Sequence, residues 1–364
     1  MGWKHYLFLV AVAGAVTVAL TPLVRSWSLR HGFVDLGGGR KVHSGAMSRL
    51  GGVAMFAGFA AAFVVEYLGE RYLGWGGGML NAGTQLVGVL VGLFVVFVTG
   101  VVDDLFTLSP GIKFGGQLAA AAIVIASGLK VEFLGNPFGS GGLVYIGFLS
   151  IPITLLWILG FTNVINLIDG LDGLAAGVTA IAVTSFLVLA VQGNFLVAAT
   201  LAAVLVGSCL GFLRYNFNPA SIIMGDSGAL FLGFALACIS LLGVMKSVVA
   251  ITLVVPLLVV GVPIVDTASA IVRRVRHQRP IQEADRGHIH HRLLDRGFNQ
   301  RQTVLIIYVW SIALAFGGYA MRYVPGFIKL GAFVVLAVLS GLMANWLGLF
   351  EAVHAHPEAT EAEE

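Results

Sequence analysis

Two carboxylates stand together at the end of one long apolar run, in a chain that is otherwise poor in charge. Asp103 and Asp104 are adjacent there, and Lys113 follows ten residues after Asp103. Adjacent carboxylates at an apolar boundary repel each other, so at least one is expected to need a cation or a proton. A hard cation such as Mg²⁺ prefers carboxylate or amide oxygens together with substrate phosphates. The pair and the lysine therefore favour a phosphate and Mg²⁺ site, with a solvated helix end as the structural alternative.

A second polar cluster follows a later apolar run and has the spacing of one helix face. Asn166, Asp169 and Asp172 are three residues apart, which predicts a slowly drifting helical stripe. Gly170 and Gly173 weaken a helix and permit close backbone approach. The segment lacks the twelve-residue ligand pattern and the closing Glu of a calcium loop, which excludes that interpretation. A functional cluster is favoured, and a polar re-entrant segment is the structural alternative.

A third cluster, Met224-Gly225-Asp226-Ser227-Gly228, precedes another apolar run. Asp and Ser are favoured at helix N-caps, so capping is the structural alternative for this segment. The same helix start also offers backbone N–H groups that can bind a phosphate. Capping and metal binding are compatible roles for different residues, so the segment stays a candidate site.

Three histidines lie in an arginine-rich loop further along the chain. His288, His290 and His291 follow Arg286, with further arginines after them. Zinc needs three or four converging ligands, and the arginines would oppose a dication. Imidazole and guanidinium donors favour a diphosphate instead.

Asp266 is a carboxylate inside an apolar run and is therefore a functional candidate by default. Arg273 or Arg274, about two turns later, is within reach of an ion pair. A functional and a structural role remain equally open for Asp266.

Composition identifies the scaffold that must position these residues. Of 364 residues, 58% are hydrophobic and only 11% are charged, whereas an ordinary soluble domain has roughly 25% charged residues. This excludes ordinary soluble enzymes, nucleic-acid binders and disordered chains. Glycine is abundant, with 48 residues, which suits close helix packing in lipid. We predict an all-α polytopic membrane protein.

A helix needs about 20 apolar residues to cross the hydrocarbon. This length predicts eleven transmembrane helices, over 6–24, 51–68, 83–102, 114–129, 148–165, 174–191, 195–213, 228–242, 247–272, 303–320 and 327–350. The loops after odd-numbered spans hold 15 Lys and Arg residues, and the other side holds 6. The positive-inside bias then places the N-terminus outside and the C-terminus in the cytoplasm.

Smaller features complete the predicted organisation. Residues 130–146 indicate a small external β-hairpin. Because no domain boundary, linker or long-period repeat interrupts the chain, we expect residues 1–350 to form a single integral membrane domain. Residues 351–364 are an acidic tail that we expect to be cytoplasmic and disordered.

The clusters, in this order on one side of the membrane, resemble the bacterial polyprenyl-phosphate N-acetylhexosamine-1-phosphate transferases, of glycosyltransferase family 4 type. The Asp-Asp pair of that family is matched by Asp103 and Asp104, and its Asn-x-x-Asn-x-x-Asp-Gly-x-x-Gly segment begins here at Asn163. Its Met-Gly-Asp-Ser-Gly segment is matched by residues 224–228. His-Ile-His-His is similar to the branch that transfers GlcNAc-1-phosphate. The first loop departs from the pattern at Ser48, because many relatives have proline at this position before the arginine, here Arg49.

The resemblance implies transfer of N-acetylglucosamine-1-phosphate from UDP-GlcNAc to undecaprenyl (polyprenyl) phosphate, with release of UMP. The product would be the first lipid-linked intermediate of a cell-envelope polysaccharide such as lipopolysaccharide or teichoic acid. The implied cofactor is Mg²⁺, with Mn²⁺ as a substitute, and the implied location is the bacterial inner membrane with the active site facing the cytoplasm. The implied partners are the donor, the acceptor and the lipid bilayer, without nucleic acid; a homodimer is left open.

The resemblance also implies roles for individual residues. Asp103 and Asp104 are the catalytic residues, with Asp103 as the base that acts on the acceptor phosphate. Asn166 and Asp226 are the metal ligands. The implied substrate-binding residues are Lys113, Asn163, Asp169, Asp172, Asn218, Arg286, His288, His290 and His291.

Other functions remain as alternatives. The same chemistry could use another UDP-N-acetylhexosamine or UDP-MurNAc-pentapeptide. An ion-coupled transporter is less favoured, because transporters place their acids near the midplane and often have two related halves. A non-catalytic scaffold is less favoured still, because it would not retain so many costly polar residues.

Overall fold

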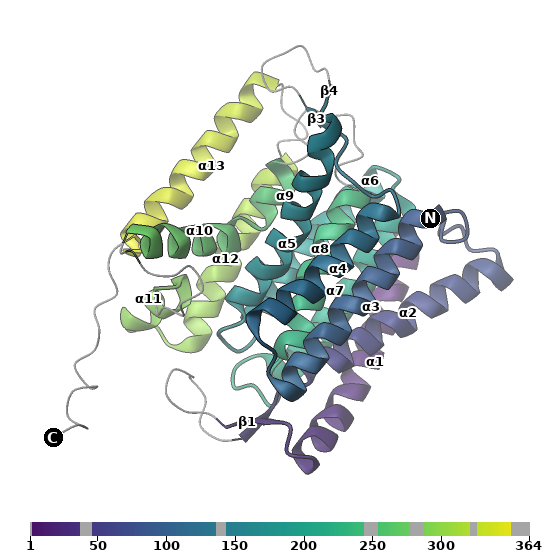
Figure 1. Ribbon diagram of the computed structural model, residues 1–364, viewed down its shortest axis with the longest axis horizontal. Coiled ribbons are helices and arrows are strands. Elements are labelled where there is room, and N and C mark those ends of the chain that lie inside the picture. Colours follow the sequence, from purple (N-terminus) through teal and green to yellow (C-terminus); the bar gives the residue numbers. More distant parts are fainter. Residues whose placement is uncertain are drawn as a thin grey trace.

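The described chain is built almost wholly from helices, and most of the long ones run side by side in one bundle (Figure 1). The computed structural model describes residues 2–36, 46–135, 143–243, 254–276, 278, 287–320 and 326–350. The first eight helices are α1 (Trp3–Arg30), α2 (Gly51–Leu73), α3 (Gly83–Phe106), α4 (Pro110–Ala126), α5 (Ser150–Ile168), α6 (Leu174–Gln192), α7 (Leu196–Asn216) and α8 (Gly225–Leu242). The others are α9 (Val254–Val259), α10 (Gly261–Arg276), α11 (Ile289–Asp295), α12 (Gln300–Ala320) and α13 (Gly326–Trp346).

The helices follow the apolar runs of the sequence. Eight described helices are long and apolar enough to cross a bilayer: α1, α2, α3, α5 with the short 3₁₀ turn before it, α6, α7, α8 and α12. The apolar helix α4 and residues 331–346 of α13 are shorter. A bilayer requires every backbone polar group to be satisfied internally, which a helix does. The predicted class, an all-α polytopic membrane protein, is confirmed.

The helix predicted over 247–272 is divided in the structure. Its described part forms α9 and α10, which are separate helices on either side of Val260. Gly261 and Pro263 lie in the first turn of α10. A proline there costs no hydrogen bond, because the N–H groups of the first turn have no acceptor within the helix. In Figure 1, α10 lies across the direction of the neighbouring α12. Because of this break, α10 does not run in the same direction as the bundle helices.

The centre of the bundle is formed by α7 and α8. Helix α7 packs against α1, α2 and α6, and α8 packs against α3, α5 and α2. Every residue of α8 from Ser227 to Leu242 is buried. Because α8 begins at Gly225, the residues at its start are held by the surrounding helices.

Two small antiparallel hairpins lie outside the bundle. Strand β3 (Phe133–Gly135) pairs with β4 (Leu143–Tyr145), which confirms the hairpin predicted over 130–146. Strand β1 (Val34–Leu36) pairs with β2 (Ala46–Ser48), and this hairpin was not predicted. The backbone carbonyl of Ser48 accepts the N–H of Ile223 at 3.0 Å, which ties the first loop to the segment before α8.

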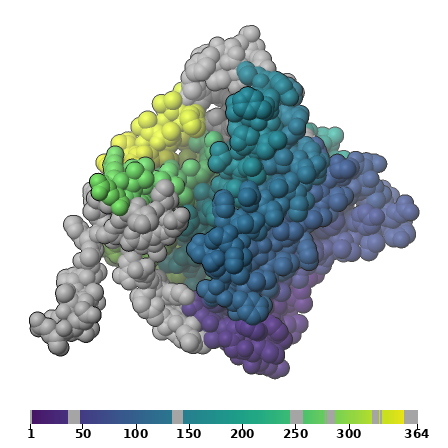
Figure 2. Space-filling view, viewed as in Figure 1, coloured from purple at the N-terminus to yellow at the C-terminus, as the bar shows by residue number. Residues whose placement is uncertain are grey.

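The outer surface is rich in apolar side chains. In Figure 2, α3, α4 and α5 form one continuous face in blue and teal. Large exposed side chains on these helices include Val91, Phe94, Val98, Leu118 and Leu156. A soluble protein rarely exposes such a contiguous apolar face, whereas lipid tails cover it at no cost. The acidic tail, 351–364, lies outside the described residues.

Candidate active site

A cavity of about 330 Å³ opens where several helices end. Six residues predicted as site residues line it: Asn166, Asp169, Asp172, Asp226, His290 and His291. They come from the end of α5, the loop after it, the start of α8 and the short helix α11. Residues up to 125 positions apart in the sequence therefore meet in one acidic pocket with histidines at its edge.

The loop after α5 corrects the expected helical stripe. Helix α5 ends at Ile168, so Asp169 and Asp172 lie beyond it rather than along its face. Gly173 is in the left-handed region at φ 78°, where glycine carries no steric penalty, and the chain turns there into α6. A β-carbon on Gly170 would lie 2.6 Å from Nε2 of His290. The loop thus brings the backbone of Gly170 directly against the histidine.

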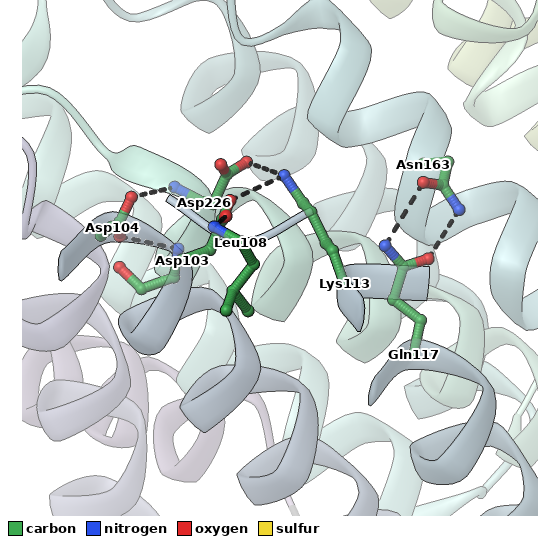
Figure 3. Close-up of polar contacts among 8 residues, drawn as sticks. Asp103, Asp104, Leu108, Lys113, Gln117, Asn163 and Asp226 are labelled. Atoms are coloured by element: carbon green, nitrogen blue, oxygen red, sulfur yellow. Dashed lines mark hydrogen bonds and ion pairs between the residues drawn. The ribbon is translucent and has the colours of Figure 1, made fainter. Parts of the chain in front are cut away.

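Lys113 joins two carboxylates at one edge of the site (Figure 3). Its Nζ lies 3.1 Å from Oδ2 of Asp103 and 2.6 Å from Oδ1 of Asp226. The other oxygen of Asp103 accepts the backbone N–H of Leu108 at 2.7 Å. The ammonium group therefore compensates a buried acid, Asp103, and a partly buried one, Asp226, that would otherwise repel each other.

Asp104 has a different environment from its neighbour (Figure 3). Its two carboxylate oxygens accept the backbone N–H groups of Asp226 at 2.8 Å and Ser227 at 3.0 Å. These are donors at the start of α8, which has no hydrogen bond from a capping side chain of its own. Asp104 therefore caps α8, and the expectation that Asp226 or Ser227 caps it is wrong. The N–H groups of Asp226 and Ser227 bond to Asp104 instead of being free for a phosphate.

The approach of Asp104 depends on Gly225. Gly225 has φ 71°, and a β-carbon there would lie 2.0 Å from the carbonyl oxygen of Arg49 and 2.6 Å from Oδ2 of Asp104. Neither the backbone angle nor the space permits a larger residue. The glycine lets the chain turn into α8 with Asp226 directed at Lys113.

The remaining acids form a cluster that fits a hard divalent cation. The pKa of Asp169 is raised to about 7 by burial and by the negative charges of Asp226, Asp104 and Asp172. A cation among these groups would relieve that repulsion. In the described part of the chain, no three His, Cys, Asp or Glu side chains converge as a complete metal site. Mg²⁺ keeps several waters and uses phosphates as ligands, so Asp226 and the nearby amide of Asn166 fit it better than they fit zinc.

The histidines occupy the opposite edge of the pocket. His290 and His291 belong to α11 and line the cavity, and His288 immediately precedes that helix. The pKa of His290 is lowered to about 3 by burial and by the neighbouring imidazoles of His291 and His288. His290 is therefore a neutral ring at neutral pH and can donate one hydrogen bond. Arg286, the predicted phosphate ligand in this loop, lies outside the described residues.

Asp266 has partners that the sequence did not predict. Its Oδ2 lies 3.0 Å from Nδ1 of His288, and its Oδ1 accepts the backbone N–H of Ile289 at 2.7 Å. The carboxylate is therefore directed at the histidine segment, rather than serving only as a partner for Arg273 or Arg274.

Two predicted substrate-binding residues brace the site from outside its lining. Asn163 donates to Oε1 of Gln117 at 2.7 Å and so joins α5 to α4 (Figure 3). Asn218 donates to Oδ2 of Asp172 at 3.0 Å and to Oε1 of Gln300 at 2.5 Å. These amides hold the helices and loops that carry the pocket residues.

Four lining residues with polar or charged side chains were not among the predicted site residues: Asp35, Arg49, Asn216 and Gln300. Asn216 accepts the N–H of Gly173 at 3.0 Å and donates to the carbonyl of Ile222 at 2.9 Å, so it joins two of the polar loops. Its place beside the third cluster was a usable signal. Asp35 stands between Val34 and Leu36, and Gln300 lies in the polar run 299–302. Only the packing of the first hairpin and of α12 brings them to the cavity.

The fold and pocket define the class: a polytopic membrane protein with an acidic, histidine-edged cavity at its helix ends. Residues 86–244 match the family described as "Glycosyl transferase family 4". The chain is 38% identical over 330 residues to "Probable undecaprenyl-phosphate N-acetylglucosaminyl 1-phosphate transferase" of Bacillus subtilis (strain 168), covering 91% of this chain and 88% of the relative. The chain belongs to glycosyl transferase family 4, which confirms the resemblance seen in its motifs.

Two further relatives frame the choice of donor. "Decaprenyl-phosphate N-acetylglucosaminephosphotransferase" of Mycolicibacterium smegmatis is 34% identical, with 91% of this chain and 86% of that relative covered. "Phospho-N-acetylmuramoyl-pentapeptide-transferase" of Shouchella clausii is 38% identical over 167 residues, but this match covers only 44% of this chain and 48% of the relative. The GlcNAc-named relatives thus match over most of the chain, and the muramoyl-named one over less than half.

Proposed function

We propose that this protein transfers N-acetylglucosamine-1-phosphate from UDP-GlcNAc to a polyprenyl phosphate such as undecaprenyl phosphate and releases UMP. The observation that carries this proposal is the cavity at the helix ends, where Asn166, Asp169 and Asp226 face His290 and His291. Hard oxygen donors beside imidazoles suit a diphosphate bound with Mg²⁺. The printed names of the relatives with nearly full coverage support GlcNAc as the transferred sugar.

The position of the cavity suits one substrate from lipid and one from water. A polyprenyl tail dissolves only in the bilayer, while its phosphate sits at the interface beside helix ends. The donor is a soluble nucleotide, so the cavity must face the compartment that holds it. The excess of Lys and Arg on the loops of this side supports a cytoplasmic active site in the bacterial inner membrane.

Asp226 and Asn166 are the residues that would hold Mg²⁺, with Mn²⁺ as a substitute. When bound, the cation would neutralise phosphate oxygens and the charge that develops on the leaving UMP. Lys113 already faces Asp226 at 2.6 Å, so this carboxylate lies in a position that receives positive charge. Asp169 lies in the same acidic cluster and helps attract the cation.

Asp103 is the base for the acceptor. An oxygen of the acceptor phosphate attacks the β-phosphorus of the donor, the bond from that phosphorus to the bridging oxygen breaks, and UMP leaves. Lys113 keeps Asp103 ionised, since its Nζ lies 3.1 Å from the carboxylate, and Asp103 becomes a stronger base for the acceptor's proton when that contact is released. Lys113 can then transfer its contact to a phosphate. Asp104 supports this step by fixing Asp226 through the start of α8.

The donor is held from the histidine edge. His290 and His291 contact its phosphate or sugar, and Arg286 and His288 are the other residues of this segment that we assign to donor binding. Asp169 and Asp172 orient the uridine end. Asn163 and Asn218 act by holding α5 and the loop after α7 in place, as their contacts with Gln117 and Asp172 indicate.

A UMP-release assay tests the proposal with purified protein, Mg²⁺, undecaprenyl phosphate and a panel of UDP-sugars. UDP-GlcNAc should give the largest kcat/KM, and a chelator should abolish turnover until Mg²⁺ or Mn²⁺ is restored. Asp226→Asn should lose about 10³-fold or more, as expected when a metal ligand is removed from phosphoryl transfer. The matched control is Glu132→Gln, an exposed acid by the second hairpin, which should retain normal turnover.

Other outcomes of the same assay identify the alternatives. Turnover with UDP-MurNAc-pentapeptide alone would change the donor, and full activity in excess chelator would remove the metal. Absence of UMP release with every donor, together with ion-driven uptake in vesicles, would favour a transporter. The mass of the active particle in detergent distinguishes a single chain from a homodimer.

A further inference from the structure

Asp266 is an acid that connects directly to the histidine segment. It lies on α10, is only 2% exposed, and contacts that segment through both oxygens. One oxygen accepts the backbone N–H of Ile289 and the other meets Nδ1 of His288. Neither metal binding nor base catalysis, as assigned above, uses this residue. A buried carboxylate is costly, so its retention here needs a role.

The contact with His288 fixes the position of a proton. A carboxylate only accepts hydrogen bonds, so Nδ1 of His288 must carry a hydrogen to bond Oδ2 of Asp266 at 3.0 Å. In a neutral ring, Nε2 then presents its lone pair. The ring plane is fixed as well, and it lies parallel to the ring of His290, with 3° between planes and 5.7 Å between centroids.

The contact with Ile289 fixes the helix that carries the pocket histidines. Helix α11 has seven residues, too few to be stable without tertiary support. Asp266 supplies an acceptor for its first N–H and a negative charge at its positive end. His290 follows one residue later, with Nε2 against Gly170 of the acidic loop. A displacement of α11 would therefore move His290 within the cavity.

A second contact from the same face of α10 supports this arrangement. Arg273 lies seven residues, or two turns, after Asp266, and a β-carbon on Gly287 would lie 2.1 Å from its guanidinium carbon. The residues before α11 are thus held by α10 at two adjacent points. Helix α10, which is separated from α9 within the predicted span, therefore supports the segment that carries the pocket histidines.

We propose that Asp266 is a positioning residue for the donor: by bonding Nδ1–H of His288 and N–H of Ile289, it sets the tautomer of His288 and the placement of His290. The proposal rests on the proposed function only where it names the donor. Asp266 touches neither substrate nor metal and acts through these two partners.

The Asp266→Asn variant changes the tautomer of His288 but keeps the hydrogen bond that caps α11. The amide keeps one oxygen for the N–H of Ile289, but its NH₂ then faces Nδ1 of His288 and requires that nitrogen to be an acceptor. The proton of His288 moves to Nε2, while α11 keeps its capping contact. Asp266→Ala removes both contacts and is the less informative variant, since it leaves a buried donor without a partner.

Steady-state kinetics on the full-length enzyme test the effect on the donor. Asp266→Asn should lower kcat/KM for UDP-GlcNAc by about 10- to 100-fold, the usual effect of removing a residue that orients a histidine. KM for the lipid acceptor and the melting temperature should change little. Asp295→Asn, at the exposed end of α11, is the matched control and should behave as wild type. Normal donor kinetics in Asp266→Asn, or equal losses for both substrates with a collapsed melting temperature, would overturn the proposal.

A conservative replacement of the partner provides a rescue test. His288→Asn can place an amide N–H where Nδ1–H was, whereas His288→Leu cannot. The Asn variant should retain at least about fivefold more activity than the Leu variant, since one charge-assisted hydrogen bond separates them. Equal loss in both would contradict the role assigned to the contact.

Histidine ¹⁵N NMR reads the tautomer without turnover. In the wild-type protein, the resonance that disappears in His288→Asn should report protonated Nδ1, and Asp266→Asn should shift it to protonated Nε2. This measurement remains valid if no UDP-sugar is turned over, in which case the proposed function fails and the Asp266 contact is still tested. An Nε2-protonated His288 in the wild type would disprove the contact itself.

Discussion

The start of α8 and the start of α11 are each capped by an aspartate from another helix, but the two aspartates bond to different groups. In both, an aspartate on another helix accepts N–H groups that a helix start leaves without partners. Both carboxylate oxygens of Asp104 accept backbone N–H groups, those of Asp226 and Ser227. Asp266 gives one oxygen to backbone and the other to an imidazole. The first cap fixes only geometry, whereas the second also fixes a proton.

The comparison explains why the two edges of the cavity have different chemistry. The α8 edge carries a carboxylate that meets positive charge, and its support needs only to hold that carboxylate in place. The α11 edge carries imidazole rings whose donors and acceptors depend on the tautomer. A support that controls protons is useful there, because a ring with its hydrogen on the wrong nitrogen cannot make the same contact.

Removing the first cap should have the largest effect. Asp104→Ala leaves two buried N–H groups without a partner, which costs about 1–3 kcal/mol each. Asp226 would also lose its orientation towards Lys113, so UMP release should fall by about 10³-fold or more. Both the melting temperature and turnover should be measured, with Glu132→Gln as control. An Asp104→Ala enzyme with normal stability would show that α8 is capped in another way.

Removing the side chain of His290, which Asp266 positions through α11, should have an intermediate effect. His290→Ala should lower kcat/KM for the UDP-sugar by about 10- to 1,000-fold if one or two contacts of about 1.5–3 kcal/mol are lost. The Mg²⁺ concentration for half-maximal activity should stay constant, because His290 holds no metal. For Asp226→Glu, in contrast, the metal requirement should move. Rescue of His290→Ala by added Mg²⁺, with unchanged donor dependence, would place the histidine on the metal side of the cavity.

The smallest effect is expected in the pH dependence of stability. The pKa of His290 is lowered from 6.5 to about 3 by burial, so the folded protein keeps this ring neutral while the unfolded chain protonates it. Stability is full above about pH 6.5 and falls as the pH decreases towards 3, by up to about 1.4 kcal/mol per pH unit. Melting temperatures at pH 7.5 and 5.5 should therefore converge in His290→Gln relative to wild type. An unchanged pH dependence in that variant would show that His290 is not buried as described.

The sequence predicts the long helices well because each is a long apolar run, and lipid demands helical hydrogen bonding within such runs. It predicts Asp169, Asp172 and Asp226, though not Asp35, because charge in such a chain is rare enough to stand out. The break between α9 and α10 could not be read from hydropathy, since the run stays apolar through Gly261 and Pro263. The prediction of a helical stripe was wrong because the glycines after Asp169 and Asp172 end α5 earlier than the three-residue spacing suggests.

The roles within the pairs needed coordinates. Asp103 and Asp104 are equivalent in sequence, but on a helix adjacent residues point about 100° apart. One therefore reaches Lys113 and the other reaches the start of α8. Asp266 offered two arginines as sequence neighbours, while its observed partners His288 and Ile289 lie beyond the following loop. Such contacts depend on how helices pack, and no local pattern encodes them.

The cap on α8 also has a consequence for biogenesis. Asp104 leaves the ribosome 122 residues before the backbone of Asp226 that it binds. At about 5–20 residues per second, the carboxylate spends about 6 to 24 seconds without its partner. During that time it must stay at the aqueous surface or hold a proton, because an unpaired carboxylate is expensive in the bilayer. The insertion of α8 is thus the event that draws Asp104 into the protein, and a chain arrested before Asp226 would keep α3 with its acidic end still in water.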